Sequence, residues 1–304
     1  MSKIINLISK PYMARYYITR LFSRLVSDEA FIEATYQANF GRRLDWDNPQ
    51  TYNEKLQWLK LYDRNPYYSE LVDKDAVKRI VEHKVGPMGI RIVPTLGVYD
   101  HFDKIDFGEL PEAFVLKCTH DSGSVVICKN KAHFDKAAAR DKLEKALKRD
   151  YYLRSREFPY KNVAHKIIVE PYLSELGEGR LLDYKLFCFN GKVYYLFIAS
   201  DRDTEVKFDY FDADFKRLDM RQAQHPTSQR VFEMPDCFEI MKQAAESLSE
   251  GIPQVRVDFY IINNEPYFGE MTFFHHGGFV PFIPDEMDFI WGSKIKLPSR
   301  QRAK

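Results

Sequence analysis

The chain has 304 residues, of which 45% are hydrophobic and 29% charged, and its formal net charge is +1. These values are typical of a globular protein with two or three lobes, and they exclude a disordered or collagen-like chain. A nearly neutral chain without interleaved basic and aromatic residues gives no reason to expect a nucleic-acid partner.

The four cysteines show no paired metal-ligand spacing, which favours reduced thiols and a cytoplasmic location. No run of apolar residues is long enough for a transmembrane helix, and no signal peptide is evident. We therefore expect a cytoplasmic protein, and contact with the inner membrane surface is left open by the amino-terminal residues.

Residues 1–70 have a helical pattern, and the first part of this stretch is basic. No acidic residue precedes Asp28, while five basic residues alternate with apolar ones: Lys3, Lys10, Arg15, Arg20 and Arg24. A basic amphipathic helix of this kind binds anionic membrane surfaces. The other interpretation is a helix whose apolar stripe packs on the body of the protein, and the sequence leaves both open.

The next elements are two helices and an interrupted strand. Thr51 and the glutamate three residues later have the spacing of a capping box, which predicts a helix at Tyr52–Tyr62. A second helix is expected at Lys74–His83. The strand expected at Ile90–Val98 is interrupted by Pro94, so we place it at a sheet edge.

A hairpin around a glycine-bearing loop follows. Its strands are expected at Ala113–Cys118 and Val125–Cys128, with Ser122-Gly123-Ser124 in the loop. Lys117, within the first strand, has two interpretations. It is either a phosphate ligand beside the loop or a charge that protects an edge strand from aggregation.

The later elements complete an α+β pattern. A charged helix is expected at 131–150, an apolar strand at 166–173, and a hairpin at 181–199 that turns at Asn190-Gly191. A further hairpin within 207–218 precedes a helix at 235–249. Strands and helices do not alternate regularly, so the class is α+β. The chain has neither the Rossmann glycine pattern nor the GxxxxGK[ST] phosphate loop.

Asp212 and Asp214 form an Asp-x-Asp pair, a pattern that metal-dependent glycosyltransferases use. In this chain the pair lies in a short polar bend, where acidic side chains usually face water. Both interpretations are kept.

The segment from Arg256 to Thr272 predicts a hairpin with strands at Arg256–Ile262 and Pro266–Thr272. If the three residues between them form the loop, Asp258 pairs with Glu270 and Arg256 pairs with Thr272. All four side chains then lie on one face of the sheet and the apolar neighbours lie on the other. A two-residue loop would turn Glu270 to the opposite face.

Two opposed carboxylates repel each other unless a cation lies between them, and hard oxygen ligands of this kind suit Mg²⁺. We interpret the hairpin as the floor of a metal–phosphate site; the alternative is an ordinary solvated face. Because removal of one acid should relieve repulsion, we expect Asp258→Asn or Glu270→Gln to keep or raise the stability of the metal-free protein. Adjacent histidines on a strand would point to opposite faces and could not share an ion without a bulge, so we expect His275 and His276 to lie in a loop that lines the acceptor pocket or to be structural.

Four features follow one another in a fixed order: a lysine early in a helix, a lysine before a glycine loop, a strand ending in a glutamate, and the Arg-x-Asp…Glu-x-Thr hairpin. In this order they resemble the ATP-grasp superfamily. The segments Thr51–Trp58 and Phe268–Phe273 are similar to its TupA-like branch, which is linked to teichuronopeptide and other surface-polysaccharide biosynthesis. The resemblance runs from about Thr51 to Gly278.

The resemblance implies an ATP-grasp fold, in which two α+β lobes with antiparallel sheets hold ATP between them. It divides the chain into a helical extension at 1–70, a preceding segment at 71–112, a small lid lobe at 113–170 and a carboxy-terminal lobe at 171–304. The last of these would carry the metal site and a basic tail.

The resemblance also implies ligands for ATP. Lys74 and Lys117 would hold its phosphates, and the backbone of Ser122, Gly123 and Ser124 would close over them. The adenine would be received by Glu170 and the following backbone, at Tyr172 and Leu173. Asp183 would lie near the ribose.

In the same way, Asp258 and Glu270 would bind Mg²⁺, and Arg256 would stabilise the charge of an acyl-phosphate intermediate. Many members of the superfamily have asparagine two residues after the second acid, where this chain has Thr272. A hydroxyl ligates Mg²⁺ less commonly than an amide oxygen, so the number of metal ions is open.

The implied activity is an ADP-forming carboxylate–amine ligase. Its substrates would be a uronic-acid carboxylate of a capsule, O-antigen or wall polysaccharide, or of a precursor, and an amino acid or amino alcohol. The runner-up is a glycosyltransferase of the same pathways, with Asp212 and Asp214 as metal ligands. The third interpretation is a nucleotide-binding accessory protein without turnover.

Overall fold

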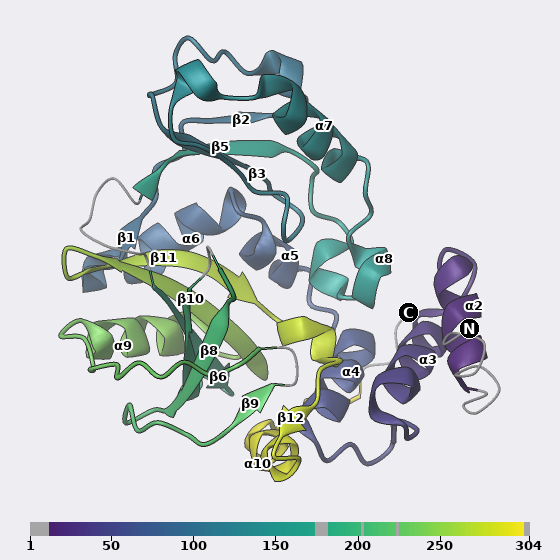
Figure 1. Ribbon diagram of the computed structural model, residues 1–304. Helices are drawn as coiled ribbons and strands as arrows, with labels where there is room; N and C mark the ends of the chain where they lie inside the picture. The colour runs from purple at the N-terminus through teal and green to yellow at the C-terminus, as the bar shows by residue number, and fades with distance from the viewer. Residues whose placement is uncertain (1–11, 174–181, 202–203, 223–224, 301–304) are drawn as a thin grey trace.

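A computed structural model describes residues 12–173, 182–201, 204–222 and 225–300, and Figure 1 shows two sheets one above the other. The larger sheet has six strands, in the spatial order β1 (Arg91–Ile92), β11 (Glu265–Thr272), β10 (Gln254–Ile262), β6 (Asp183–Phe189), β7 (Lys192–Ser200) and β8 (Lys207–Asp212). β1 runs parallel to β11, and the other neighbours are antiparallel.

The smaller sheet has the order β2 (Gly97–Tyr99), β5 (Ile167–Pro171), β3 (Phe114–Cys118) and β4 (Val126–Cys128). Its apolar face packs on α7 (Lys136–Leu147), whose Leu143 is fully buried. Two short strands, β9 (Arg221–Gln222) and β12 (Phe282–Ile283), pair separately. The single strand expected at Ile90–Val98 is two strands, because the chain leaves the larger sheet after β1, passes Pro94 and enters the smaller sheet at β2. Both β1 and β2 lie at sheet edges, as the interruption by Pro94 predicted.

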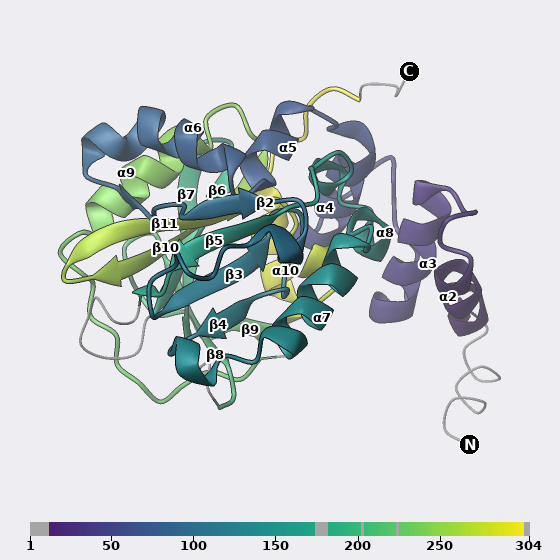
Figure 2. The same cartoon turned by 90° about the horizontal axis from the view of Figure 1, so that it is seen from above.

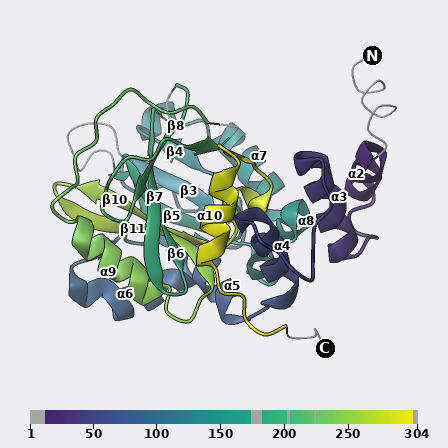
Figure 3. The same cartoon turned by 90° about the horizontal axis from the view of Figure 1, so that it is seen from below.

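One face of the larger sheet is covered by α6 (Ala76–Val85) and α9 (Phe238–Leu248), which lie side by side in Figures 2 and 3. Cys188 on β6 contacts the α9 backbone, with 3.6 Å between its Sγ and the Ala245 carbonyl oxygen. All four cysteines are buried and free.

Part of the opposite face is covered by α4 (Tyr52–Tyr62) and α10 (Glu286–Lys294). Trp291 of α10 stacks on Tyr195 of β7, with 4.4 Å between ring centroids, and Tyr52 packs edge-on against the Trp291 ring. α4 has the predicted bounds, and its capping box is present, with 3.0 Å from the Thr51 amide nitrogen to the Glu54 carboxylate. Helix α4, which lies within the predicted extension at 1–70, therefore belongs to the core of the larger sheet. The division of the chain into four segments stays a prediction.

Among the described residues there are four further α-helices: α2 (Tyr12–Leu21), α3 (Asp28–Phe40), α5 (Tyr67–Val72) and α8 (Tyr152–Ser155). α2 and α3 pack together at one side of the molecule (Figure 2). Within the described ranges, no helix is both long and apolar enough to cross a membrane.

Candidate active site

The β10–β11 hairpin turns on two residues, and the expected three-residue loop is wrong. Asn263 and Asn264 both have positive φ, 51° and 61°, and Ile262 pairs directly with Glu265. Paired positive φ values are those of the tight turn that matches strand twist. A regular ladder from this turn would place Glu270 on the wrong face.

The register is nevertheless the expected one, because β11 contains a bulge. Phe259 pairs with Phe268, whereas Asp258 pairs with Glu270, so Gly269 is an extra residue between the two pairs. A side chain has little room there, since a β-carbon on Gly269 would lie 3.0 Å from the Asp258 carbonyl oxygen. The bulge thus returns Glu270 to the face of Asp258.

Asp258 is held by two cations. Its carboxylate accepts hydrogen bonds from Arg256 Nε and Nη2, both at 2.7 Å, and it also bonds Lys185 from the neighbouring strand β6. Glu270 is more open: its side chain is 41% exposed, and its Oε1 lies 3.5 Å from Arg256 Nη2. Thr272 Oγ1 accepts a further bond from Arg256 at 3.0 Å. The opposed carboxylates are therefore separated by positive charge that the protein itself supplies.

Lys185 was missed by sequence reasoning. The sequence does indicate it, because a lysine inside the apolar strand β6 would be buried, and a buried charge destabilises the fold unless it has a partner. The structure pairs Lys185 directly with Asp258 in the ladder, and its Nζ also lies 3.4 Å from Asp183 Oδ2. Asp183, expected near a ribose, is fully buried beside this lysine.

The charges of this cluster support one another. Burial alone would raise the pKa of Asp258, but Arg256 and Lys185 together hold it below its usual range. Burial lowers the pKa of Lys185, which Asp258 partly offsets. Removing the Asp258 charge would leave two buried cations with less compensation, so the expected gain in stability does not follow for this residue.

The Arg256 guanidinium, which bonds Asp258, is also held by a chain of hydrogen bonds through His275 and Gln222. Its Nη1 lies 2.6 Å from His275 Nδ1, and His275 Nε2 lies 2.7 Å from the side-chain oxygen of Gln222. Arginine only donates, so Nδ1 accepts and Nε2 carries the proton. Tyr210 also donates to Gln222, at 3.0 Å. Burial and the charge of Arg256 keep the pKa of His275 well below its usual value, which maintains this neutral form.

His275 and His276 lie in a short 3-10 segment, His275–Gly278, and not on a strand. His276 has a φ of 50°, and its ring stacks 5.4 Å from that of His225. In the parts of the chain that the structure describes, no three His, Cys, Asp or Glu side chains are grouped so as to hold a metal ion by themselves.

A second charged cluster lies on the smaller sheet. β3 is an interior strand, so the interpretation of Lys117 as an edge-strand charge is wrong. Lys117 Nζ lies 2.5 Å from one oxygen of Glu170, and Lys78 Nζ of α6 lies 2.7 Å from the other. Burial would raise the pKa of Glu170, but these lysines lower it. Glu170 thus holds two lysines in place, and Lys78 was missed although it follows Lys74 by only four residues.

The loop after β3 contacts Lys74. Lys74 precedes helix α6 rather than opening it, and its Nζ donates to the Asp121 carbonyl oxygen. Ser124 is buried, and its Oγ accepts a bond from the Cys118 amide at 3.0 Å. Ser122 and Gly123 form the exposed tip, where Gly123 has a φ of 99°. Lys74 is therefore near the loop that was expected to close over phosphates, and burial lowers the pKa of this lysine.

The remaining predicted residues lie at the edges of these clusters. Tyr172 and Leu173 follow β5 and are half-buried, with Lys129 Nζ 5.8 Å from the Tyr172 ring. Asp212 uses its carboxylate locally, since Oδ1 accepts bonds from the amides of Asp214 at 3.0 Å and Lys216 at 2.9 Å. This turn lies at the end of β8, which is separated from β10 by two strands.

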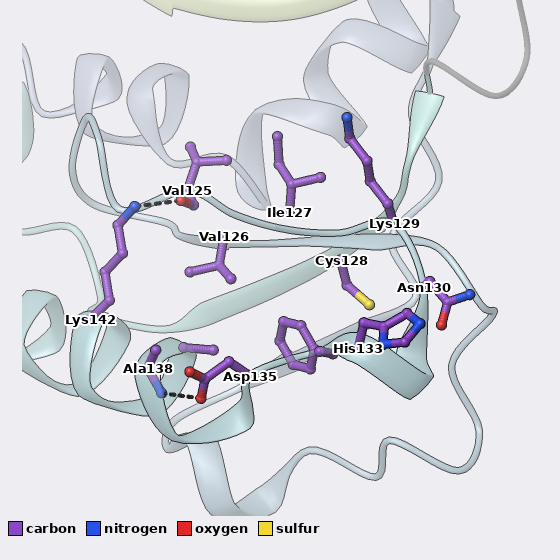
Figure 4. A pocket seen from close by; sticks show the side chains of 12 residues that line it. Val125, Val126, Ile127, Cys128, Lys129, Asn130, His133, Asp135, Ala138 and Lys142 are labelled. Carbon is purple, nitrogen blue, oxygen red and sulfur yellow. Dashed lines mark hydrogen bonds between the residues drawn. The ribbon is translucent and has the colours of Figure 1, made fainter. Parts of the chain in front are cut away.

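A pocket of about 520 Å³ lies elsewhere, between β4 and α7 (Figure 4). Its wall includes Val125, Ile127 and Lys142, and Lys142 Nζ donates to the Val125 carbonyl oxygen at 2.7 Å. None of the predicted site residues belongs to its lining.

Comparison with known proteins identifies the family. The model of a family described as TupA-like ATP-grasp matches residues 54–296, and no curated protein matches the chain. Similar solved structures include the D-alanine–D-alanine ligase of Bacillus anthracis complexed with ATP, with 18% identity, 67% of this chain and 55% of that chain covered, and a TM-score of 0.36.

Two further structures are similar. D-cycloserine synthetase DcsG has 18% identity, coverage of 68% and 64% of the two chains and a TM-score of 0.34. The ATP-grasp ligase PsnB, complexed with a minimal precursor, Mg and ADP, has 10% identity, coverage of 73% and 57% and a TM-score of 0.37. The chain thus spans 55% to 64% of the length of these three proteins. Because the family model matches most of the sequence, the chain belongs to the TupA-like ATP-grasp family, with the α+β ATP-grasp fold that the sequence predicted.

Proposed function

We propose that this protein is an ATP-dependent ligase that joins a carboxylate to an amine and releases ADP and phosphate. The observation that carries the proposal is the opposed pair Asp258 and Glu270 beside Arg256 and Lys185, in a chain of the ATP-grasp family. Carboxylates and buried cations on one sheet face are what a metal–triphosphate complex requires.

The charge balance indicates how the site would take its substrate. ATP brings phosphates, which need cations, and Mg²⁺ needs carboxylates. Arg256 and Lys185 would release Asp258 and bind phosphate oxygens in its place. The carboxylates of Asp258 and Glu270 and the Thr272 hydroxyl would then be available to bind the metal ion. When bound, Mg²⁺ would reduce the negative charge of the triphosphate and favour the departure of ADP.

The proposed reaction has two steps. A carboxylate oxygen of the first substrate attacks the γ-phosphorus, and the bond from that phosphorus to the ADP oxygen breaks. The amine nitrogen then attacks the acyl carbon, the bond to phosphate breaks, and the nitrogen loses a proton. The protein mainly positions the reactants and stabilises charge, and Arg256 would serve the acyl phosphate.

The smaller sheet would act as a lid on ATP. Lys74 and Lys117 would hold phosphates as point charges, and the Ser122-Gly123-Ser124 backbone would close over them. Glu170 would keep Lys117 in place while the backbone through Tyr172 and Leu173 receives adenine, with Asp183 near the ribose.

The proposed substrates follow from the family. A uronic-acid carboxylate of a surface polysaccharide or its precursor would be joined to an amino acid or amino alcohol, and the reaction would take place in the cytoplasm. The test is to incubate purified protein with ATP, Mg²⁺ and a panel of uronates and amines, and to measure ADP and phosphate. Release that depends on both co-substrates supports the ligase.

Other outcomes of the same assay favour the alternatives. Turnover of a nucleotide sugar that is lost in Asp212→Asn would support a glycosyltransferase. ATP binding without turnover under any pair of co-substrates would support an accessory protein.

His275 should act as a positioning residue for Arg256. We expect His275→Phe to lower kcat about 10- to 100-fold, the worth of a hydrogen bond to a charged group, with a smaller change in KM for ATP. His275→Gln keeps an acceptor for Arg256 and a donor for Gln222, so it should recover much of the rate. Equal kcat values in the wild type and the Phe variant would contradict this role.

The lid loop gives a further prediction. Lys117→Ala should weaken ATP binding, because a compact positive charge is lost where phosphates gather. Gly123→Val should slow phosphoryl transfer about tenfold through backbone strain, since Gly123 has a φ of 99° and a β-carbon there meets no atom within 4 Å. Gly123→Asn tolerates positive φ better and is the control. Wild-type rates in Lys117→Ala, with unchanged hydrogen exchange of residues 113–128 on adding ATP, would contradict the lid.

A further inference from the structure

Helix α2 and the turn after it expose a cluster of large apolar side chains, which we call the α2 patch. Its exposed fractions are 41% for Tyr17, 57% for Ile18, 77% for Leu21, 49% for Phe22 and 83% for Leu25. Single exposed apolar residues are ordinary on a protein surface, but a contiguous group marks a contact site.

The patch is the outer face of a helix whose inner face is already in use. Arg15 forms an ion pair with Glu33 of α3 at 2.8 Å, and Thr19 is buried. The guanidinium of Arg20 lies 5.8 Å from the centre of the Phe31 ring, which is itself buried. Contacts with α3 thus orient α2, and they direct the patch away from the protein.

Basic residues accompany the apolar ones. Arg20 and Arg24 are exposed beside the patch, and no acidic residue precedes Asp28 in the sequence. Asp28 itself is neutralised by Arg64, at 2.7 Å. Glu29, exposed in the first turn of α3, is the nearest acid beyond it. The surface is therefore apolar with a positive rim.

This combination selects one kind of partner. A second copy of the chain would bring arginine against arginine across a symmetric interface. Residues 1–11 contain lysines and no acid, so they would add like charge if they covered the patch. An anionic lipid surface satisfies both features, because apolar side chains enter the acyl boundary while arginines contact lipid phosphates.

The position of α2 in the molecule agrees with such a contact. α2 and α3 project at one side, away from both sheets, in Figures 1 and 2. A flat surface can therefore meet α2 from that side without passing over either sheet. We propose that the α2 patch binds the surface of an anionic lipid bilayer, with Leu21, Phe22 and Leu25 inserted and Arg24 at the phosphates. The proposal is independent of the ligase activity.

The test is sedimentation of the full chain with vesicles of phosphatidylcholine, with and without phosphatidylglycerol. We expect binding only when the anionic lipid is present, and weaker binding as salt rises. Leu21→Glu/Leu25→Glu should reduce the bound fraction at least tenfold. Val231→Glu changes an apolar residue that is 90% exposed elsewhere and should leave binding unchanged.

Two further variants keep the test decisive. Leu25→Glu alone alters the most exposed residue of the patch and should also weaken binding, with unchanged circular dichroism and thermal unfolding. Arg24→Gln should reduce binding severalfold and flatten its salt dependence. Equal sedimentation of the wild type and the double variant, or equal binding to pure phosphatidylcholine, overturns the proposal. The proposal is also overturned if vesicles do not sediment the wild type and light scattering shows that the wild type is a dimer and the double variant a monomer.

Discussion

Asp258→Asn is expected to abolish ligase activity and also to destabilise the protein, whereas Glu270→Gln is expected to abolish activity alone. Asp258 is 1% exposed and holds Arg256 and Lys185, so its neutralisation leaves two buried cations without their main partner. Breaking a buried pair costs about 3–5 kcal/mol. Glu270 has a side chain that is 41% exposed and contacts Arg256 only at 3.5 Å, so its loss should change stability little.

Urea unfolding of the metal-free variants and ADP release at saturating Mg²⁺ test this difference. Lys185→Met provides a control, because it removes one of the two buried cations that lose their partner in Asp258→Asn. The double variant Asp258→Asn/Lys185→Met should unfold at a higher urea concentration than Asp258→Asn. If Asp258→Asn were as stable as the wild type, the two cations would not depend on Asp258. If either acid variant kept near-normal turnover, the proposed metal ligands would be wrong.

The features predicted correctly from the sequence are those set by local signals. The capping box at Thr51 fixes the start of α4, and Asn190-Gly191 adopts positive φ, 51° and 78°, as its hairpin turn requires. Alternation along Arg256–Ile262 placed Val257 and Phe259 in the core. Each of these signals acts within a few residues, where the chemistry of the chain is decisive.

The partners in the charged clusters could not be predicted, because they come from distant segments. Lys185 and Asp258 are 73 residues apart, and Lys117 and Glu170 are 53 apart. Their meeting depends on which strands are neighbours, and strand order is not written in any one segment. For the same reason Lys117 looked like an edge-strand charge, although β3 lies between β5 and β4.

The amino-terminal helix confirms the packing alternative in part, and membrane contact stays a proposal. Its sequence suggested either a membrane-facing helix or one that packs on the protein. In the structure α2 packs on α3 with one side and exposes Leu21 and Leu25 on another. A basic amphipathic pattern specifies the faces of a helix but not what covers them.

The predicted pairing of Asp258 with Glu270 depends on a single residue, Gly269. The hairpin loop has two residues, which by itself would turn Glu270 away from Asp258, and the bulge at Gly269 corrects the register. A β-carbon at this position would lie 3.0 Å from the Asp258 carbonyl oxygen and 3.1 Å from the Tyr260 ring. Since the first of these atoms belongs to the backbone, it cannot move aside cheaply.

Gly269→Val should therefore lower the free energy of unfolding by about 1–3 kcal/mol and reduce turnover at least tenfold. Deletion of Gly269 is expected to be less harmful to activity than its replacement by valine. Without the extra residue, Phe268 still pairs with Phe259 and Glu270 still pairs with Asp258, in a regular ladder. The deletion variant should then keep more activity than the substitution, although deletions within strands are usually the more damaging change.

Both variants can be measured by urea unfolding and by Mg²⁺-dependent ADP release, with Glu270→Gln as the reference for a lost acid. Wild-type stability and turnover in Gly269→Val would show that the close approach is harmless. A folded deletion variant as inactive as Glu270→Gln would show that the bulge does more than restore register. The expected order, with the deletion variant more active than the valine variant, follows only if the bulge serves to bring Glu270 opposite Asp258.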